Sequence, residues 1–203
     1  MSKSVLLFLA ISFTAAVMFR PTNGAVLCNA EVLMEKIIDF SNPEERSSWT
    51  IVNDGVMGGR STSLMRITDE GFANFAGILS LENNGGFAST RSSLLNRSLG
   101  GCDGLVIRVK GDGRSYRFRL RTSKDFDGVA YQREFQTAEG KWIELVLPFT
   151  EFVASYRGRL LPERGSVDPS AIRQIGFLIA DKKPRPFTLT IAWIASYHST
   201  VKP

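Results

Sequence analysis

Two sets of side chains in this sequence are suited to binding chemistry. The first is the loop from Trp49 to Ser61, in which Asn, Asp and Gly residues surround the apolar pair Val56 and Met57. Glycine permits positive φ, and Asn and Asp tolerate it, so this composition predicts a tightly folded turn. We expect Trp49 to pin one end of the loop, and Val56 and Met57 to tuck beneath the end of a sheet.

This loop has two interpretations. It is either a structural turn that plugs the end of a sheet or a loop that contacts a ligand or partner, because loops on rigid scaffolds often carry function. The candidate partner-binding residues are Trp49, Asp54 and Arg60, and the candidate structural residues are Gly55, Met57, Gly58 and Gly59. On the structural interpretation, Asp54→Asn should leave the melting temperature nearly unchanged, since the amide keeps the turn-forming geometry.

The second set is a run of alternating arginines and apolar residues. On a strand, Arg117, Arg119 and Arg121 project from one face, and the intervening apolar residues project from the other. Further candidate binding residues on neighbouring predicted strands are Tyr131, Arg133 and Trp142. The polar side of this sheet is either an ordinary solvated face or a shallow site suited to sugars, carboxylates or a partner protein.

Catalysis has few candidates. His198 lies beyond the last predicted strand, where termini are commonly mobile, and Cys102 has no neighbouring base in the sequence. The carboxylates that could pair as in a glycosidase show no distinguishing spacing; they are Asp54, Asp125, Asp127, Glu134, Glu144 and Asp181. We therefore expect no catalytic residues, no metal-ligand set and no cofactor, although a structural calcium ion held by Asp and carbonyl oxygens is possible.

β-Strands must position these groups. Alternating apolar and polar residues bounded by Gly, Asn, Asp and Pro predict strands at 72–81, 87–91, 105–110, 115–122, 129–137, 142–147, 175–180 and 187–196. Residues 32–40 form a short helix or a first strand. The turn chemistry of 111–114 and 138–141 predicts two hairpins. The fold class is therefore all-β, an antiparallel sandwich or jelly roll of about eight or nine strands.

The N-terminus has the pattern of a signal peptide. Lys3 precedes an apolar run, Val5–Phe19, and small residues follow, which predicts a leader over residues 1–30 with cleavage near Gly24 or Ala30. We expect a single exported domain, periplasmic or secreted, over 31–203, with no stable transmembrane segment after processing. A membrane anchor formed by the uncleaved leader is the alternative.

The charge and the cysteines do not indicate a nucleic-acid-binding protein or a disulfide-stabilised scaffold. Removing residues 1–30 takes away two basic residues and no acid, which lowers the net charge from +5 to +3. Such a mildly basic domain does not indicate binding to nucleic acid. The two cysteines, Cys28 and Cys102, provide no disulfide framework.

Several motifs, in this order, resemble the family called complex I intermediate-associated protein 30. They are Trp49 with 54–61, 75–77, 82–89, 111–113, 148–149, 156–159, 175–177 and 187–189. The resemblance covers about residues 37–197. It implies a β-sandwich like that of galactose-binding domains and similar to some carbohydrate-binding modules.

The resemblance also implies a function. The mitochondrial members of this family are non-catalytic assembly factors for respiratory NADH dehydrogenase. It therefore implies a chaperone-like protein that binds a membrane-complex subunit or an assembly intermediate, and an exported carbohydrate-binding module is the alternative. Sugar binding predicts exposed coplanar aromatic rings, whereas protein binding predicts an apolar patch rimmed by polar groups.

Overall fold

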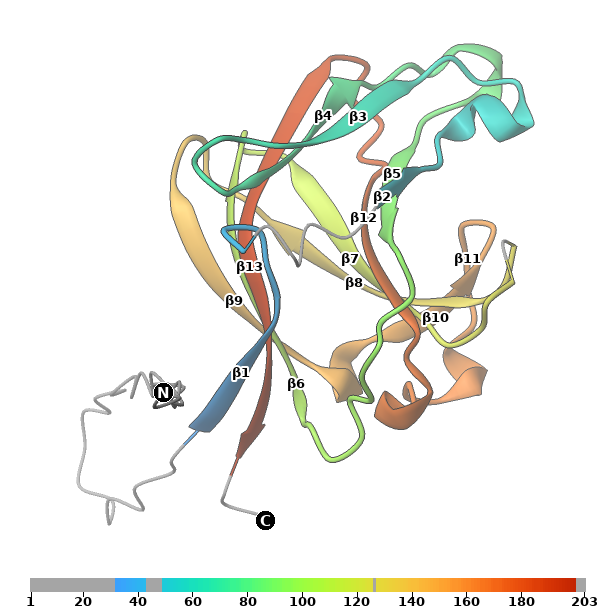
Figure 1. Cartoon of the computed structure of the whole chain (residues 1–203). Coiled ribbons are helices and arrows are strands. Elements are labelled where there is room, and N and C mark those ends of the chain that lie inside the picture. The colour runs from blue at the N-terminus through green and yellow to red at the C-terminus, as the bar shows by residue number, and fades with distance from the viewer. Residues whose placement is uncertain (1–31, 43–48, 126, 200–203) are drawn as a thin grey trace, which may run out of the picture.

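The computed structural model describes residues 32–42, 49–125 and 127–199, and the predicted leader lies outside these ranges. The described chain is built almost entirely of β-strands (Figure 1). They are β1 (Val32–Asp39), β2 (Trp49–Ile51), β3 (Thr62–Ile67), β4 (Ala73–Ile78), β5 (Ala88–Ser92), β6 (Gly104–Gly111), β7 (Ser115–Arg121), β8 (Ala130–Gln136), β9 (Trp142–Pro148), β10 (Val153–Tyr156), β11 (Arg159–Leu160), β12 (Gln174–Ile179) and β13 (Pro186–Ser199).

Short 3-10 turns interrupt the connections between strands. They are η2 (Asp54–Met57), η3 (Glu82–Asn84), η4 (Phe149–Glu151), η5 (Pro162–Arg164) and η6 (Pro169–Ala171). Within the described ranges, no helix has the length and hydropathy that crossing a bilayer requires.

The strands form two antiparallel sheets that pack face to face, which confirms the predicted sandwich. One sheet, here called the β13 sheet, has the order β3-β4-β13-β6-β9, and β1 also pairs with β13. The other, the β7 sheet, has the order β11-β10-β8-β7-β12-β5-β2. The ambiguous first segment is a strand, and β13 extends to Ser199. His198 therefore lies within β13, opposite Leu33, and its predicted position beyond the last strand is wrong.

The core lies between the sheets and follows the predicted alternation. In β7, Tyr116, Phe118 and Leu120 are fully buried, as are Leu105 and Ile107 of β6 in the facing sheet. Their burial supplies the main driving force for packing the two layers. The arginines of β7 consequently lie on the outer face of the β7 sheet.

Both predicted hairpins are wrong. β6 and β7 flank residues 111–114 but belong to different sheets, and so do β8 and β9 on either side of 138–141. Each turn is therefore an arch that carries the chain from one layer to the other. As a result, Trp142, paired with Lys110, lies on the outer face of the β13 sheet, opposite to the arginines of β7. The predicted common polar face does not exist.

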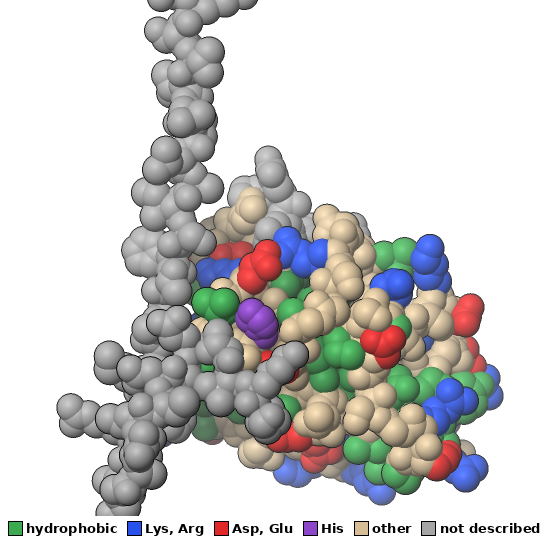
Figure 2. All heavy atoms as spheres, turned by 90° about the horizontal axis from the view of Figure 1, so that it is seen from below, with side chains coloured by type: hydrophobic (Ala, Val, Ile, Leu, Met, Phe, Trp, Pro, Cys, Tyr) green, Lys and Arg blue, Asp and Glu red, His purple; other side chains and the backbone are tan. Residues whose placement is uncertain are grey.

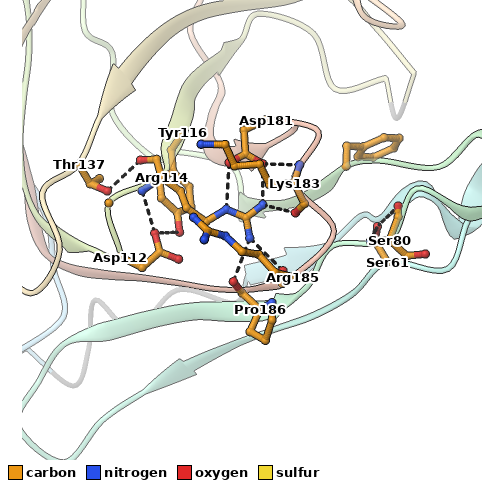
Figure 3. Close-up of polar contacts among 12 residues, drawn as sticks. Ser61, Ser80, Asp112, Arg114, Tyr116, Thr137, Asp181, Lys183, Arg185 and Pro186 are labelled. Atoms are coloured by element: carbon orange, nitrogen blue, oxygen red, sulfur yellow. Dashed lines mark hydrogen bonds and ion pairs between the residues drawn. The ribbon is translucent and has the colours of Figure 1, made fainter.

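A buried arginine explains the first arch (Figure 3). The guanidinium of Arg114 forms an ion pair with Asp181, donating from Nε at 2.9 Å and from Nη2 at 2.5 Å. It also donates to the backbone carbonyls of Lys183, Arg185 and Pro186 at 2.7–2.9 Å. All five N–H donors are satisfied. The arch is thus held by a segment that lies about 70 residues further along the chain.

Asp112 and Thr137 add hydrogen bonds at this corner of the sandwich, where the two arches meet the segment after β12. Asp112 accepts hydrogen bonds from the Tyr116 hydroxyl at 3.0 Å and from the Thr188 amide at 2.9 Å. The Thr137 hydroxyl donates to the Arg114 carbonyl at 2.8 Å, which joins the two arches (Figure 3). The turn sequence therefore serves a sheet-to-sheet crossing in which polar groups are buried and paired.

We expect Arg114→Met to lower the free energy of unfolding by about 3–5 kcal/mol, because it leaves the buried Asp181 carboxylate without its partner. The control is Arg117→Met, which breaks the more exposed pair with Glu134 and should cost less than about 1 kcal/mol. Chemical denaturation of the two variants measures both values. Equal effects would show that the buried pair does not hold the corner.

Candidate functional site

The loop after β2 is organised around the carboxylate of Asp54, which is fully buried. Oδ1 accepts a hydrogen bond from the Ser61 amide at 2.8 Å, and Oδ2 accepts one from the Ser61 hydroxyl at 2.5 Å. Oδ2 also accepts from the amides of Gly86 at 2.6 Å and Phe87 at 3.3 Å. One carboxylate therefore fixes the loop at 53–61 to the loop that precedes β5.

Ser61 extends this network to a third segment. The amide of Ser80 donates to the Ser61 hydroxyl at 3.0 Å, next to the end of β4 (Figure 3). The chain on either side of Ser61 is thus tied to both sheets at this end of the sandwich.

Glycine is required at the positions around Asp54 for two different reasons. A Cβ on Gly59 would lie 2.6 Å from Asp54 Oδ1, and a Cβ on Gly85 would lie 2.6 Å from Oδ2, so neither position has room for a side chain. Gly58 instead has φ of 88° with open space around it, a conformation that side chains resist. The most distinctive motifs of the sequence are therefore the walls of a carboxylate cage.

The electrostatics of the cage favour the ionised acid. Burial alone would raise the pKa of Asp54, but the hydrogen bonds from Ser61, Gly86 and Phe87 outweigh it and hold the pKa below its ordinary value. The carboxylate is surrounded by three backbone amides and one hydroxyl, and it is closed to solvent. We therefore regard Asp54 as a group that holds the loop, although it was predicted as a ligand contact.

Val56 and Met57, here called the apolar tip, are exposed. Their side chains are 63% and 62% accessible, so the expectation that they tuck beneath the sheet is wrong. The reason is that the loop is fixed by the carboxylate of Asp54 and not by apolar burial. Figure 1 shows η2, which carries the tip, projecting beyond β2 and β3 at the upper right.

Contacts from the neighbouring loop support the tip. The amide of Asn83 donates from Nδ2 to the Gly58 carbonyl at 3.1 Å, and Arg60 forms an exposed ion pair with Glu82 at 2.9 Å. Trp49 pins the other end as expected, with its ring 6.2 Å from that of Phe177 in a stacked arrangement. The apolar tip is therefore a solvent-facing feature on a fixed support.

The arginine run forms a second candidate surface. Arg119 and Arg121 line a small recess on the outer face of the β7 sheet, together with Arg91 of β5, which the sequence analysis missed. Arg117 lies further along the same face in an ion pair with Glu134 at 3.1 Å. The residues around Arg91 in the sequence do not indicate a binding role. Arg91 comes close to the β7 arginines only because β5 pairs with β12.

The remaining predicted binding residues lie elsewhere. Tyr131 is opposite Leu120 and packs against the core, and Arg133 faces the same side, where it forms an ion pair with Glu151 at 2.6 Å. On the other sheet, Trp142 lies beneath the cationic groups of Arg108 and Lys110, at 5.6 and 5.2 Å from its ring centroid. These residues therefore do not form one site with the β7 arginines.

Among the described residues, no three His, Cys, Asp or Glu side chains lie close enough together to hold a metal ion. The structural calcium ion stays a prediction. Figure 2 shows the end of the molecule seen from below, where basic and acidic side chains are scattered among apolar ones around the single histidine.

Comparison with known sequences identifies a family. The family described as complex I intermediate-associated protein 30 matches residues 38–191, which confirms the resemblance drawn from the motifs. The mitochondrial complex I intermediate-associated protein 30 of Drosophila melanogaster is 28% identical over 180 residues, covering 78% of this chain and 61% of that protein. The protein of the same name from Mus musculus is 27% identical over 190 residues, covering 82% and 58%. The chain thus spans about three fifths of the length of these relatives.

Solved structures agree on the fold. The family 11 carbohydrate-binding module of a cellulosomal cellulase of Clostridium thermocellum has a TM-score of 0.61 at 16% identity, covering 80% of this chain and 93% of the module. The same type of module in complex with a mixed-linked tetrasaccharide has a TM-score of 0.58 at 16% identity, covering 81% and 95%. At this identity the likeness supports the sandwich fold and carries no information about the ligand.

The relatives correct the predicted location. The proteins from Drosophila melanogaster, Mus musculus and Neurospora crassa are all described as mitochondrial, so the prediction of an exported protein is wrong. Secretory and mitochondrial leaders share a basic, acid-poor composition, and residues 1–30 contain no acid. The apolar run Val5–Phe19 decided the interpretation in favour of export, and it lies outside the described residues.

We expect Asp54→Asn to lower the free energy of unfolding at pH 7 by about 2–4 kcal/mol, because the amide NH₂ places a donor against donors. This replaces the expectation that the substitution is nearly silent. Because the folded pKa of Asp54 is depressed, its contribution is complete above the unfolded value of about 3.9 and declines as the pH falls through the folded value. The difference between wild type and variant, measured by denaturation from pH 7 to 2, should therefore narrow in acid. A constant difference would contradict the ionised cage.

We expect Gly59→Ala and Asp54→Ala to destabilise less together than the sum of their separate effects, by about 1–2 kcal/mol, because shortening Asp54 removes Cγ and Oδ1, the two atoms that lie nearest to the new methyl group. Gly58→Ala and Asp54→Ala should instead be additive within about 0.5 kcal/mol, since Gly58 has open space and only its backbone is strained. Double-mutant cycles from urea denaturation test both pairs. Additivity at Gly59 would show that packing on Asp54 does not select that glycine.

Proposed function

Because the chain belongs to the complex I intermediate-associated protein 30 family, we propose that it binds intermediates of complex I assembly in mitochondria without catalysing a reaction. The relatives' names describe such an association for those proteins. The observation in this chain that carries the proposal is the apolar tip, an exposed hydrophobic pair on a fixed loop.

The tip has the properties of an interface anchor. Val56 and Met57 expose most of their apolar surface, and burying one such side chain contributes about 1.5–3 kcal/mol. Binding usually also costs conformational entropy when a loop is ordered. Here the Asp54 cage already orders the loop, so more of the burial free energy remains for affinity. Methionine adds adaptability, because its flexible thioether fits surfaces of different shape.

The tip is also rimmed by charge of both signs. Arg60 and Glu82 flank it with an exposed ion pair, a rim that suits a polar boundary around an apolar contact. This arrangement matches the protein-binding pattern expected from the sequence. A single pair of side chains is small for a whole interface, so further surface of the chain contributes to any stable complex.

A glycan partner has less support from the geometry. Sugar rings stack on free aromatic faces, whereas the Trp142 ring lies 5.1 Å from Phe72 and has Arg108 and Lys110 over it. The recess lined by Arg91, Arg119 and Arg121 is too small to admit a sugar ring. We therefore propose a protein partner and keep carbohydrate binding as the alternative that the experiment below addresses.

We expect the double variant Val56→Ser, Met57→Ser to bind complex I intermediates about tenfold more weakly or worse, the loss that corresponds to one buried aliphatic side chain. The measurement uses the full-length chain in isolated mitochondria, with blue native electrophoresis to score co-migration with complex I subunits. A photo-crosslinking residue at position 57 should form adducts with a subunit of the intermediate.

The control is Val146→Ser, which alters a side chain of similar exposure on the outer face of the β13 sheet. It should leave co-migration unchanged, and all variants should keep the wild-type melting temperature. Equal co-migration of the double variant and the wild type would remove the tip from the proposal. Failure of the wild-type chain to co-migrate, together with retention on a glycan array, would favour the carbohydrate-binding alternative.

A further inference from the structure

Three arginines from two strands surround the recess on the outer face of the β7 sheet. Arg91 comes from β5, and Arg119 and Arg121 come from β7; β12 lies between these strands. Gly176 of β12 is directly opposite both Arg91 and Arg119. The two arginines therefore start about 10 Å apart, on either side of a position that has no side chain.

Gly176 keeps this space open for a structural reason. A Cβ there would overlap the carbonyl oxygen of Thr90 on β5, so the close approach of the two strands excludes every larger residue. The floor of the recess is consequently bare backbone. Side chains of the length of arginine can lean over it from both sides.

Arg119 and Arg121 differ from the other arginines of β6–β7 and its turn in how their charge is balanced. Arg114 is paired with Asp181, and Arg117 is paired with Glu134. Among the described residues, by contrast, neither Arg119 nor Arg121 has a carboxylate oxygen within 4.0 Å. This is unusual for arginine side chains that are largely removed from solvent.

Burial makes the imbalance costly. Arg121 is only 5% exposed, and its Nη1 donates to the carbonyls of Asp125 and Gly128 at 3.3 and 3.2 Å. The buried Nε of Arg119 has no hydrogen-bond partner among the described residues. Neutral carbonyls orient a guanidinium but do not cancel its charge. A buried donor without a partner has a desolvation cost that an external acceptor would remove.

The pKa values report the same repulsion. Burial, followed by the charges of Arg121 and Arg91, lowers the pKa of Arg119 to about 10, and burial with the charge of Arg121 lowers that of Arg91 to about 10. Both groups remain cationic at neutral pH. Asp127, the acid whose charge partly offsets the lowering of the pKa of Arg91 and Arg121, also forms an ion pair with Arg157.

We propose that this recess binds a phosphate group, with Arg91, Arg119 and Arg121 as its ligands. A guanidinium presents its N–H donors in a fork that matches phosphate oxygens, and a dianion offsets more of the cluster's positive charge than a carboxylate does. The recess is too small for a ring but admits one oxygen of a tetrahedral oxyanion, with the rest of the group above it. This inference is independent of the proposed function, because it concerns a different surface from the apolar tip.

Thermal denaturation of the purified chain tests the proposal with inorganic phosphate as the probe. Phosphate should raise the melting temperature relative to chloride at equal ionic strength and pH, in a saturable way. Arg119→Gln should weaken phosphate binding about tenfold or more, the loss of a charge-assisted hydrogen bond. Without phosphate, Arg119→Gln should melt no lower than the wild type, because it removes a repelled charge.

A matched control separates this site from general charge effects. Arg108→Gln removes an exposed arginine from the outer face of the β13 sheet and should leave the phosphate response unchanged. The double variant at Val56 and Met57 should also keep it. If Arg119→Gln does not fold, Arg91→Gln provides the same test from the neighbouring strand.

Two further probes identify the source of the phosphate. Glycerol phosphate represents a soluble ester, and vesicles of phosphatidylcholine with or without phosphatidic acid represent a lipid headgroup. Binding to either probe that depends on Arg119 supports the proposal and assigns its source. The proposal is overturned if phosphate stabilises no more than chloride and neither probe binds, or if Arg119→Gln and Arg91→Gln bind as the wild type does.

Discussion

A single buried carboxylate joins the two layers of this sandwich at one end. Asp54 follows β2 of the β7 sheet, and its oxygens hold Ser61, which precedes β3 of the β13 sheet, and Gly86, which precedes β5. Two connections that are remote in sequence, β2–β3 and β4–β5, therefore converge on one charged group. The projection of Val56 and Met57 into solvent follows from this, because hydrogen bonds to an ion fix the loop and its apolar side chains are not needed for the fold.

Local sequence patterns were sufficient for the fold class and for most of the strands, but they did not predict β2, β3, β10 and β11. The period of two in β7 placed Phe118 in the core and Arg119 outside, since alternation follows directly from strand geometry. The same patterns could not give the pairing of strands. Residues 111–114 and 138–141 have turn chemistry that serves a hairpin or an arch equally well. The choice depends on Arg114 and its partners after β12, which no local window contains.

In the candidate sites too, some features could be predicted from local sequence and others depend on residues that are remote in the chain. Asp54, Gly58 and Gly59 could be singled out from their types and spacing, but their role depends on Gly85 and Gly86, more than 25 residues away. Arg119 and Arg121 were found because they share a strand face, whereas Arg91 joins them only through β12. Trp142 was assigned to the wrong face because its strand crosses to the other sheet. Residues on one strand could be grouped from sequence; residues on different strands could not.

The position of β13 has a consequence for the order in which this chain acquires its structure. β13 is the last described strand in the sequence, yet it lies between β4 and β6 and also pairs with β1. The hydrogen-bonding edges of β4 and β6 therefore stay open until residues 186–199 are available, and β12 similarly completes the β7 sheet between β5 and β7. A chain emerging from a ribosome or entering a compartment N-terminus first cannot close either sheet early. Pairs such as β3–β4 and β7–β8 can form earlier, but the open edges of β4, β6, β5 and β7 need protection from other unpaired strands until β12 and β13 are available.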